Sequence, residues 1–184
     1  MRIVRSKLFK GVPLYRWFGL ACALVMSLAL AGCDRAAPRA AKEMAVGITG
    51  YNFTAEGVQE YYVNDSRGSN LPPHGGGGKP SCCVKLPGQW TPGLTVKVDW
   101  TVGDYALPWS KLEPMTPEQR SACCWKQRTL SQTVAVERYG DEGGRMQVFF
   151  MPHDEIKVWV SDLGLGHERH PSGMAYPKTP ADAE

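Results

Sequence analysis

Short segments in which apolar and polar residues alternate recur along this chain, and no segment shows a sustained helical period. The clearest is Leu94-Thr-Val-Lys-Val-Asp-Trp100, in which every second residue is apolar. Side chains of a strand point alternately to its two faces, so this period of two predicts a half-buried strand. Six further segments have strand character: 45–53, 58–63, 82–86, 132–138, 147–150 and 155–160. About seven short strands separated by turn residues predict an all-β domain, a single antiparallel β-sandwich, with a strongly bent sheet as the alternative.

The segments between these strands are rich in glycine, proline and other turn residues. We expect a loop over 64–80 and hairpin turns over 141–144 and 152–155. Residues 103–120 hold three prolines and several polar residues. An irregular excursion is therefore expected there, with one helical turn over 116–120.

A targeting signal precedes the expected domain. Five basic residues and no acidic residue come before an apolar run of 13 residues that ends at Leu30-Ala-Gly-Cys33. The run is shorter than the ~20 residues that cross a bilayer and fits the hydrophobic region of a signal peptide. Small residues before a cysteine resemble the bacterial lipobox, in which a peptidase cleaves and the cysteine receives acyl chains. We expect Cys33 to be lipidated; an ordinary secretory signal and a short membrane anchor are the alternatives.

This signal divides the chain into four parts. We expect a lipoprotein signal peptide over 1–32, a lipidated flexible tether over 33–44, the β-sandwich over 45–162 and a loose polar tail over 163–184. The 152 mature residues amount to one domain. Acyl chains would hold it at the bacterial cell envelope, facing the periplasm. Asp34 favours the inner membrane, although the choice between the inner and outer membranes stays open.

The charge of the mature chain argues against nucleic acid as a partner. The whole chain has 21 Lys and Arg against 18 Asp and Glu, but five of the basic residues belong to the signal. Removing them leaves 16 basic against 18 acidic residues, a net charge of −2. Binding to nucleic acid depends on a basic footprint, which this composition does not provide.

Four cysteines remain in the mature chain beyond Cys33, and they form two adjacent pairs. In the oxidising periplasm an even number of cysteines predicts disulfides. We expect two bridges that join the first pair to the second and brace the sandwich, with the choice of partners left open. Metal or redox sites, bonds between neighbouring cysteines and free thiols are the alternatives; the pairs lack the Cys-x-x-Cys spacing of zinc and thioredoxin sites. The candidates are Cys82, Cys83, Cys123 and Cys124.

The sequence favours a binding protein over an enzyme. It contains neither the Gly-x-Ser-x-Gly of a hydrolase elbow nor the His-Glu-x-x-His of a metalloprotease. His167 and His170 are three residues apart in the expected tail, where solvated side chains explain them better than a metal site does. No nucleophile is paired with a base in any motif. We therefore expect no catalytic residue, no metal and no cofactor.

A glycine-rich loop and two tryptophans are the candidates for contact with a partner. Four glycines before a lysine resemble a phosphate-binding loop, but the motif lacks the Walker ending and precedes a strand. A flexible or closely packed surface loop is the favoured interpretation. The two tryptophans lie near turns, where a half-buried position and an interface position are both possible. The candidate partner-binding residues are His74, Gly75, Gly76, Gly77, Gly78, Trp90 and Trp109.

Several motifs, in their order along the chain, resemble a known family. They are Thr49-Gly-Tyr-Asn52, His74-Gly-Gly-Gly-Gly78, Cys82-Cys-Val-Lys-Leu-Pro87, Trp90-Thr-Pro-Gly-Leu94 and Val96-Lys-Val-Asp-Trp100. This set resembles the proteobacterial lipoprotein family of unknown function DUF3304, most closely over 47–102 and more loosely as far as residue 160. The family has no established catalytic residues, so none is assigned.

The resemblance also implies a function. Genes of this family often lie near those of type VI secretion components and their phospholipase effectors. The resemblance therefore implies an immunity protein, which binds such a phospholipase in the periplasm and inhibits it. Two other classes remain: a structural or assembly lipoprotein of the envelope or the secretion apparatus, and a periplasmic enzyme with an unrecognised site.

Overall fold

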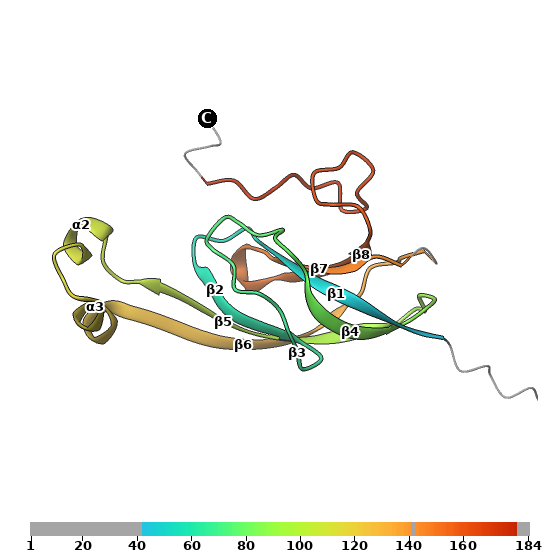
Figure 1. Cartoon of the computed structure of the whole chain (residues 1–184), viewed down its shortest axis with the longest axis horizontal. Coiled ribbons are helices and arrows are strands. Elements are labelled where there is room, and N and C mark those ends of the chain that lie inside the picture. Colours follow the sequence, from blue (N-terminus) through green and yellow to red (C-terminus); the bar gives the residue numbers. More distant parts are fainter. Residues whose placement is uncertain (1–41, 141–142, 180–184) are drawn as a thin grey trace, which may run out of the picture. The chain divides into compact units, whose positions relative to one another are not determined.

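Two four-stranded sheets pack against each other in the computed structural model, which describes residues 42–140 and 143–179 (Figure 1). The first sheet consists, in spatial order, of β4 (Ser81–Pro87), β1 (Glu43–Asn52), β7 (Arg145–Phe150) and β8 (Ile156–Ser161). The second consists of β3 (Ser66–Arg67), β2 (Gly57–Val63), β5 (Thr95–Tyr105) and β6 (Trp125–Ala135). Helices α2 (Trp109–Leu112) and α3 (Pro117–Cys124) lie between β5 and β6, and the 3-10 helix η1 (Pro152–Asp154) connects β7 to β8. The expected all-β sandwich is confirmed.

The core between the two sheets is built from every second residue of each strand. In β5, Val96, Val98 and Trp100 are buried, whereas Thr95 and Lys97 face solvent, as the alternation predicts. Edge-on aromatic contacts join the sheets: the ring of Phe150 in β7 lies 5.0 Å from that of Tyr61 in β2 and 6.1 Å from that of Trp100 in β5. Burial of this apolar surface stabilises the sandwich.

The strand pairing departs from the expected antiparallel arrangement at one place. Strands β1 and β7 are parallel, in a register that aligns Ile48 with Met146 and Asn52 with Phe150. The other strand pairs of the two sheets are antiparallel. Parallel neighbours need a long crossover, and here the crossover contains the whole second sheet together with β4 of the first. Local sequence patterns carry no information about such a distant pairing.

The expected disulfides between the two cysteine pairs are wrong. Cys82 is bonded to Cys83, and Cys123 is bonded to Cys124. The expectation treated both pairs as parts of neighbouring strands, but the second pair ends helix α3. Figure 1 shows α3 far from β4, which carries the first pair. The disulfides therefore close no long loop and do not brace one segment of the sandwich against another.

The expected loose tail is also wrong for residues 163–179, which cover the outer face of the first sheet. Leu165 is buried in a cluster with Tyr51 of β1 and Phe149 of β7, and His170 is buried beside them. The aromatic rings of Tyr51 and Phe149 stack at 5.1 Å. This outer face is apolar and needs a cover, because β7 is buried on both faces. The polar composition of the segment concealed that role.

The expected signal peptide, Cys33 and most of the tether lie outside the described residues. In the part that the structure describes, no helix is long and apolar enough to span a bilayer.

Candidate interaction surface

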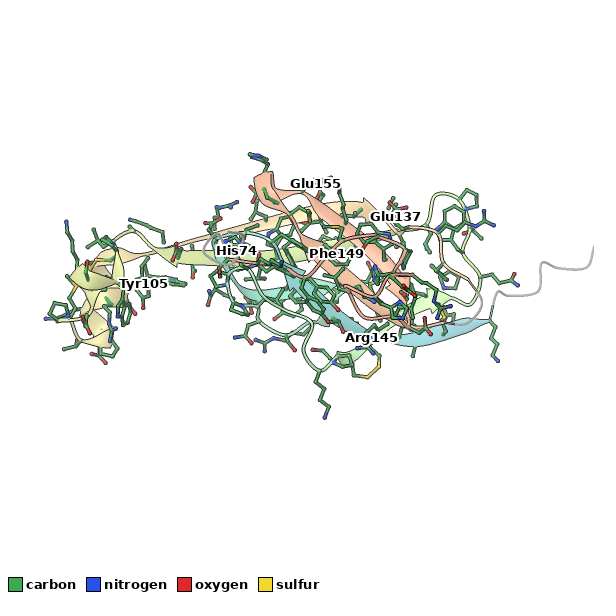
Figure 2. The ribbon with its side chains drawn as sticks, turned by 90° about the horizontal axis from the view of Figure 1, so that it is seen from above. His74, Tyr105, Glu137, Arg145, Phe149 and Glu155 are labelled. Atoms are coloured by element: carbon green, nitrogen blue, oxygen red, sulfur yellow. A yellow bond between two sulfur atoms is a disulfide. The ribbon has the colours of Figure 1, made fainter. Side chains whose placement is uncertain are left out.

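The β5–β6 hairpin continues past the sandwich and ends in the two helices (Figure 1). Its pairing is unbroken from Thr95↔Ala135 to Tyr105↔Trp125, and the amide of Ala106 then donates to the carbonyl of Cys124 at 2.8 Å. We call residues 105–125 the hairpin cap. Figure 2 shows Tyr105 at the base of the cap, at the end of the sandwich away from the start of β1.

The local sequence of the cap explains why it is helical. Thr116 caps α3: its Oγ1 accepts a hydrogen bond from the amide of Gln119 at 3.3 Å, while the Gln119 Oε1 accepts from the amide of Thr116 at 2.8 Å. This reciprocal capping box, with Pro117 at the first helical position, favours helix formation. The helical turn expected over 116–120 is confirmed and extends to Cys124. Leu112 of α2 is buried within the cap.

The cap presents a large aromatic side chain to solvent. Trp109 is 58% exposed, and the guanidinium of Arg120 lies 5.0 Å from the centre of its ring, a cation–π arrangement. An open depression of about 510 Å³ lies on the same cap. It is lined by Met115, Gln119, Ala122 and Cys123. Trp109 and this depression are two exposed apolar features of the cap.

A pair of aromatic side chains supports the base of the cap. The rings of Tyr105 and Trp125 meet edge to face with their centres 5.0 Å apart. The indole of Trp125 lies directly over Gly103, where an added Cβ would be 2.3 Å from the ring. Gly103 thus leaves the room that the indole occupies. These contacts fix the base of the cap to β5 and β6.

The glycine-rich loop is held along the edge of β1. The amide of Asn52 donates to the carbonyl of Gly75 at 2.7 Å, and the amide of Gly77 donates to the carbonyl of Gly50 at 2.9 Å. Gly76 has a φ of +139°, and a Cβ on it would lie 2.3 Å from the Gly50 carbonyl oxygen. The backbone at Gly76 and Gly77 therefore approaches β1 too closely for a side chain. Of the two forms expected from the sequence, a flexible and a closely packed surface loop, the structure shows the closely packed one.

The remaining candidates differ in their surroundings. The indole of Trp90 is half buried against the core, and its Nε1 donates to the carbonyl of Val136 at 2.8 Å. His74 is half buried, and its amide donates to the carbonyl of Thr54 at 3.0 Å. A pocket of about 360 Å³ borders the glycine-rich loop and includes Lys79. Of the aromatic candidates, Trp109 is the one that presents its ring to solvent.

Two polar networks were not predicted from the sequence. Arg128 of β6 donates to Asp154 of η1 at 2.7 Å and also to Glu56, so it joins three distant segments. These bonds to Glu56 and Asp154 raise the pKa of the Arg128 guanidinium. The second network links His170 to Gln147 of β7. Both depend on tertiary contacts between residues that share no local motif, so no signal in the sequence could have revealed them.

The described residues offer little to a metal ion. Within 42–140 and 143–179, no group of three or more His, Cys, Asp or Glu side chains is placed to hold one. The depression on the cap is lined by thioether, amide, methyl and disulfide groups, and an apolar contact is the chemistry that such a lining supports.

Comparison with known families matches residues 51–158 to the family described as "Protein of unknown function (DUF3304)". No curated protein and no solved structure matches the chain. The family match spans both sheets and the hairpin cap, which is more than half of the 184 residues. The chain therefore belongs to the DUF3304 family.

Proposed function

We propose that this chain is a lipid-anchored immunity protein of the bacterial envelope, which binds a phospholipase effector of type VI secretion and inhibits it. The observation that carries the proposal is the exposed Trp109 on the hairpin cap, which also carries an apolar depression. Trp and Arg are the side chains that most often dominate the free energy of protein–protein interfaces. The pairing of Trp109 with Arg120 brings both types to one surface.

The cap is ordered before any partner arrives. The capping box at Thr116, the buried Leu112 and the continuous β5–β6 pairing each fix part of its backbone. A surface that is already ordered loses less conformational entropy on binding, which raises affinity. A protein that must inhibit an enzyme by occupying it benefits from this rigidity.

The position of the cap suits a tethered inhibitor. Strand β1 begins at the end of the sandwich away from the cap (Figures 1 and 2). The chain that follows the expected anchor at Cys33 joins the domain at that end. A phospholipase acts at the bilayer surface, and attachment to that surface raises the effective concentration of the inhibitor near the enzyme.

The proposal is tested by mixing the purified chain with the phospholipase encoded beside its gene and measuring phospholipid hydrolysis. We expect inhibition that is complete at a small molar excess. Trp109→Ala should weaken inhibition by at least tenfold, since truncating a central tryptophan at an interface commonly costs 2 kcal/mol or more. Tyr176→Ala is the matched control, because among the described residues Tyr176 is the other large hydrophobic residue with high exposure, and it lies outside the cap. Unchanged hydrolysis at excess protein would refute the proposal.

A deletion experiment distinguishes the proposed immunity function from the alternative, a structural or assembly lipoprotein. Loss of the gene should make cells sensitive to sibling cells that deliver the phospholipase, while leaving envelope integrity intact. An envelope or secretion defect without that sensitivity favours the assembly role.

A further inference from the structure

We propose that the partner supplies an extended segment that adds to the second sheet along the free edge of β6, over residues 127–133. This inference rests on the proposed function and specifies how the partner is held. Strand addition is an established mode of peptide recognition, in which backbone hydrogen bonds provide affinity.

The direction of the backbone groups in β6 follows from its ladder with β5. The amide of Val136 donates to the carbonyl of Leu94, and the carbonyl of Cys124 accepts from Ala106, so even-numbered residues face β5. In an antiparallel ladder, alternate residues pair on one side and the residues between them point to the other side. The odd-numbered residues therefore direct their N–H and C=O groups away from β5. They are Gln127, Thr129, Ser131 and Thr133.

These outward groups are unpaired in the part of the chain that the structure describes. Strand β6 is the last strand of its sheet, and no backbone hydrogen bond involves residues 127, 129, 131 or 133 on that side. Residues 126–133 are exposed apart from the half-buried Leu130. Seven residues of strand extend over about 23 Å at ~3.3 Å per residue. The free edge is long enough for a strand of ordinary length.

The protein itself adds a strand to the next part of this edge. The amide of Glu137 donates to the carbonyl of Val158 in β8 at 2.9 Å, and Val136 is bridged in parallel to the same residue. The edge is thus able to accept a strand, and it is open between this bridge and helix α3. Figure 2 shows Glu137 at one end of this interval and Tyr105, at the base of the cap, at the other.

The usual protections of an edge strand are weak here. Strand β6 contains no proline, and its eleven-residue register with β5 has no bulge. The opposite edge of the same sheet is the two-residue β3. The inward-facing charge of Arg128 is compensated by Glu56 and Asp154. A long, regular edge with these properties favours pairing with a further strand.

The occupant that fits is an extended polypeptide with uncharged side chains. Alternating donors and acceptors at strand spacing match another backbone. The outward-face side chains of β6 that flank the edge are amides and hydroxyls, from Gln127, Thr129, Ser131 and Thr133. Opposite such residues, polar and β-branched side chains form favourable cross-strand pairs. We assign the occupant to a segment of the inhibited phospholipase.

Hydrogen exchange resolved to single amides tests the proposal with the whole chain, purified in detergent, and the phospholipase encoded beside its gene. In the free chain, the amides of Arg128, Leu130 and Gln132 should exchange slowly and those of Gln127, Thr129, Ser131 and Thr133 rapidly. With saturating phospholipase, the odd-numbered amides should slow by at least tenfold. If a complex forms and these amides still exchange rapidly, the inference is overturned while the proposed function stands. Absence of any complex overturns both.

Two variants provide an independent test. Thr133→Pro removes one outward N–H and should weaken binding at least tenfold, whereas Thr133→Ala keeps that N–H and should bind like the wild type. Each variant is first checked for a cooperative thermal transition. If Thr133→Pro does not fold, the exchange measurement on the wild-type chain decides. If the odd-numbered amides are instead protected in the chain alone, in proportion to its concentration, the occupant is a second copy and the assignment is wrong.

Discussion

Replacement of His170 by alanine should release the C-terminal segment from the first sheet. The imidazole is 4% exposed and lies among three hydrogen-bonding contacts. Its Nε2 is 3.0 Å from the Oε1 of Gln147, and its Nδ1 accepts from the amide of Ser172 at 3.1 Å and lies 2.7 Å from the Ser172 hydroxyl oxygen. Since an amide donates to Nδ1, the proton of the neutral imidazole is on Nε2 and is donated to Gln147.

The magnitude follows from what the substitution leaves behind. Gln147 is fully buried, and its Oε1 would lose its hydrogen-bond donor. A buried acceptor without a partner costs about 1–3 kcal/mol, and each lost hydrogen bond costs about 0.5–1.5 kcal/mol. We therefore expect His170→Ala to lower the free energy of unfolding by about 2–4 kcal/mol. With a urea m-value of about 2 kcal/mol/M, the midpoint should fall by roughly 1–2 M.

Urea denaturation followed by tryptophan fluorescence measures this change, with His167→Ala as the matched control. His167 is exposed, and its imidazole Nδ1 accepts a hydrogen bond from the amide of Arg169. Its replacement should shift the free energy of unfolding by no more than about 0.5 kcal/mol. Trypsin should also cleave after Arg169 faster in His170→Ala than in the control. Equal midpoints for the two variants would show that His170 does not hold the segment.

Three further predictions concern pH, backbone conformation and charge. Burial, with a smaller contribution from His167, lowers the pKa of His170 below 6.5, so the unfolded chain binds more protons near that pH and stability is lost on acidification. The urea midpoint should fall from pH 7.5 to pH 5 in the wild type and less in His170→Ala. Gly76→Ala should destabilise by about 1–3 kcal/mol in thermal melts, because of its positive φ and the nearby carbonyl, whereas Gly78→Ala, with open space around it, should have little effect. Arg128→Met should cost no more than about 1 kcal/mol, because the ion pairs are partly exposed, and this cost should shrink in 1 M NaCl.

Local patterns predicted those parts of the fold that local physics determines. The alternation from Leu94 to Trp100 identified the buried face of β5, because burial of one face of a strand imposes a period of two. Thr116 and Pro117 identified the start of α3, because a capping residue and a proline favour the first turn of a helix. The same reasoning underestimated the length of β5 and β6. Val102 of β5 is still part of the core, whereas the exposed residues 126–129 of β6 are not, so alternation between the two faces does not mark the full length of these strands.

The other features depend on contacts between distant segments. The cysteine pairs gave no information about their surroundings, so the expectation of cross-links assumed a proximity that the fold does not provide. One signal in the sequence indicates that the first sheet is covered on its outer face. Phe149 and Phe150 are adjacent and apolar and point to opposite faces of β7, so both faces of this strand must be buried. That signal indicates that a cover exists. It does not identify residues 163–179 as the cover.

The two surfaces proposed for the partner make different contributions to recognition. Backbone pairing along residues 127–133 depends little on the partner's sequence, because every extended segment offers the same donors and acceptors. Trp109 and the depression on the same cap require a partner of complementary shape and apolar character. Since specificity is a difference between affinities, the edge of β6 would raise affinity for many strands while the cap selects among them. Substitution of Trp109 should therefore reduce the preference for the correct phospholipase over its homologues, whereas Thr133→Pro should weaken binding to all of them by a similar factor.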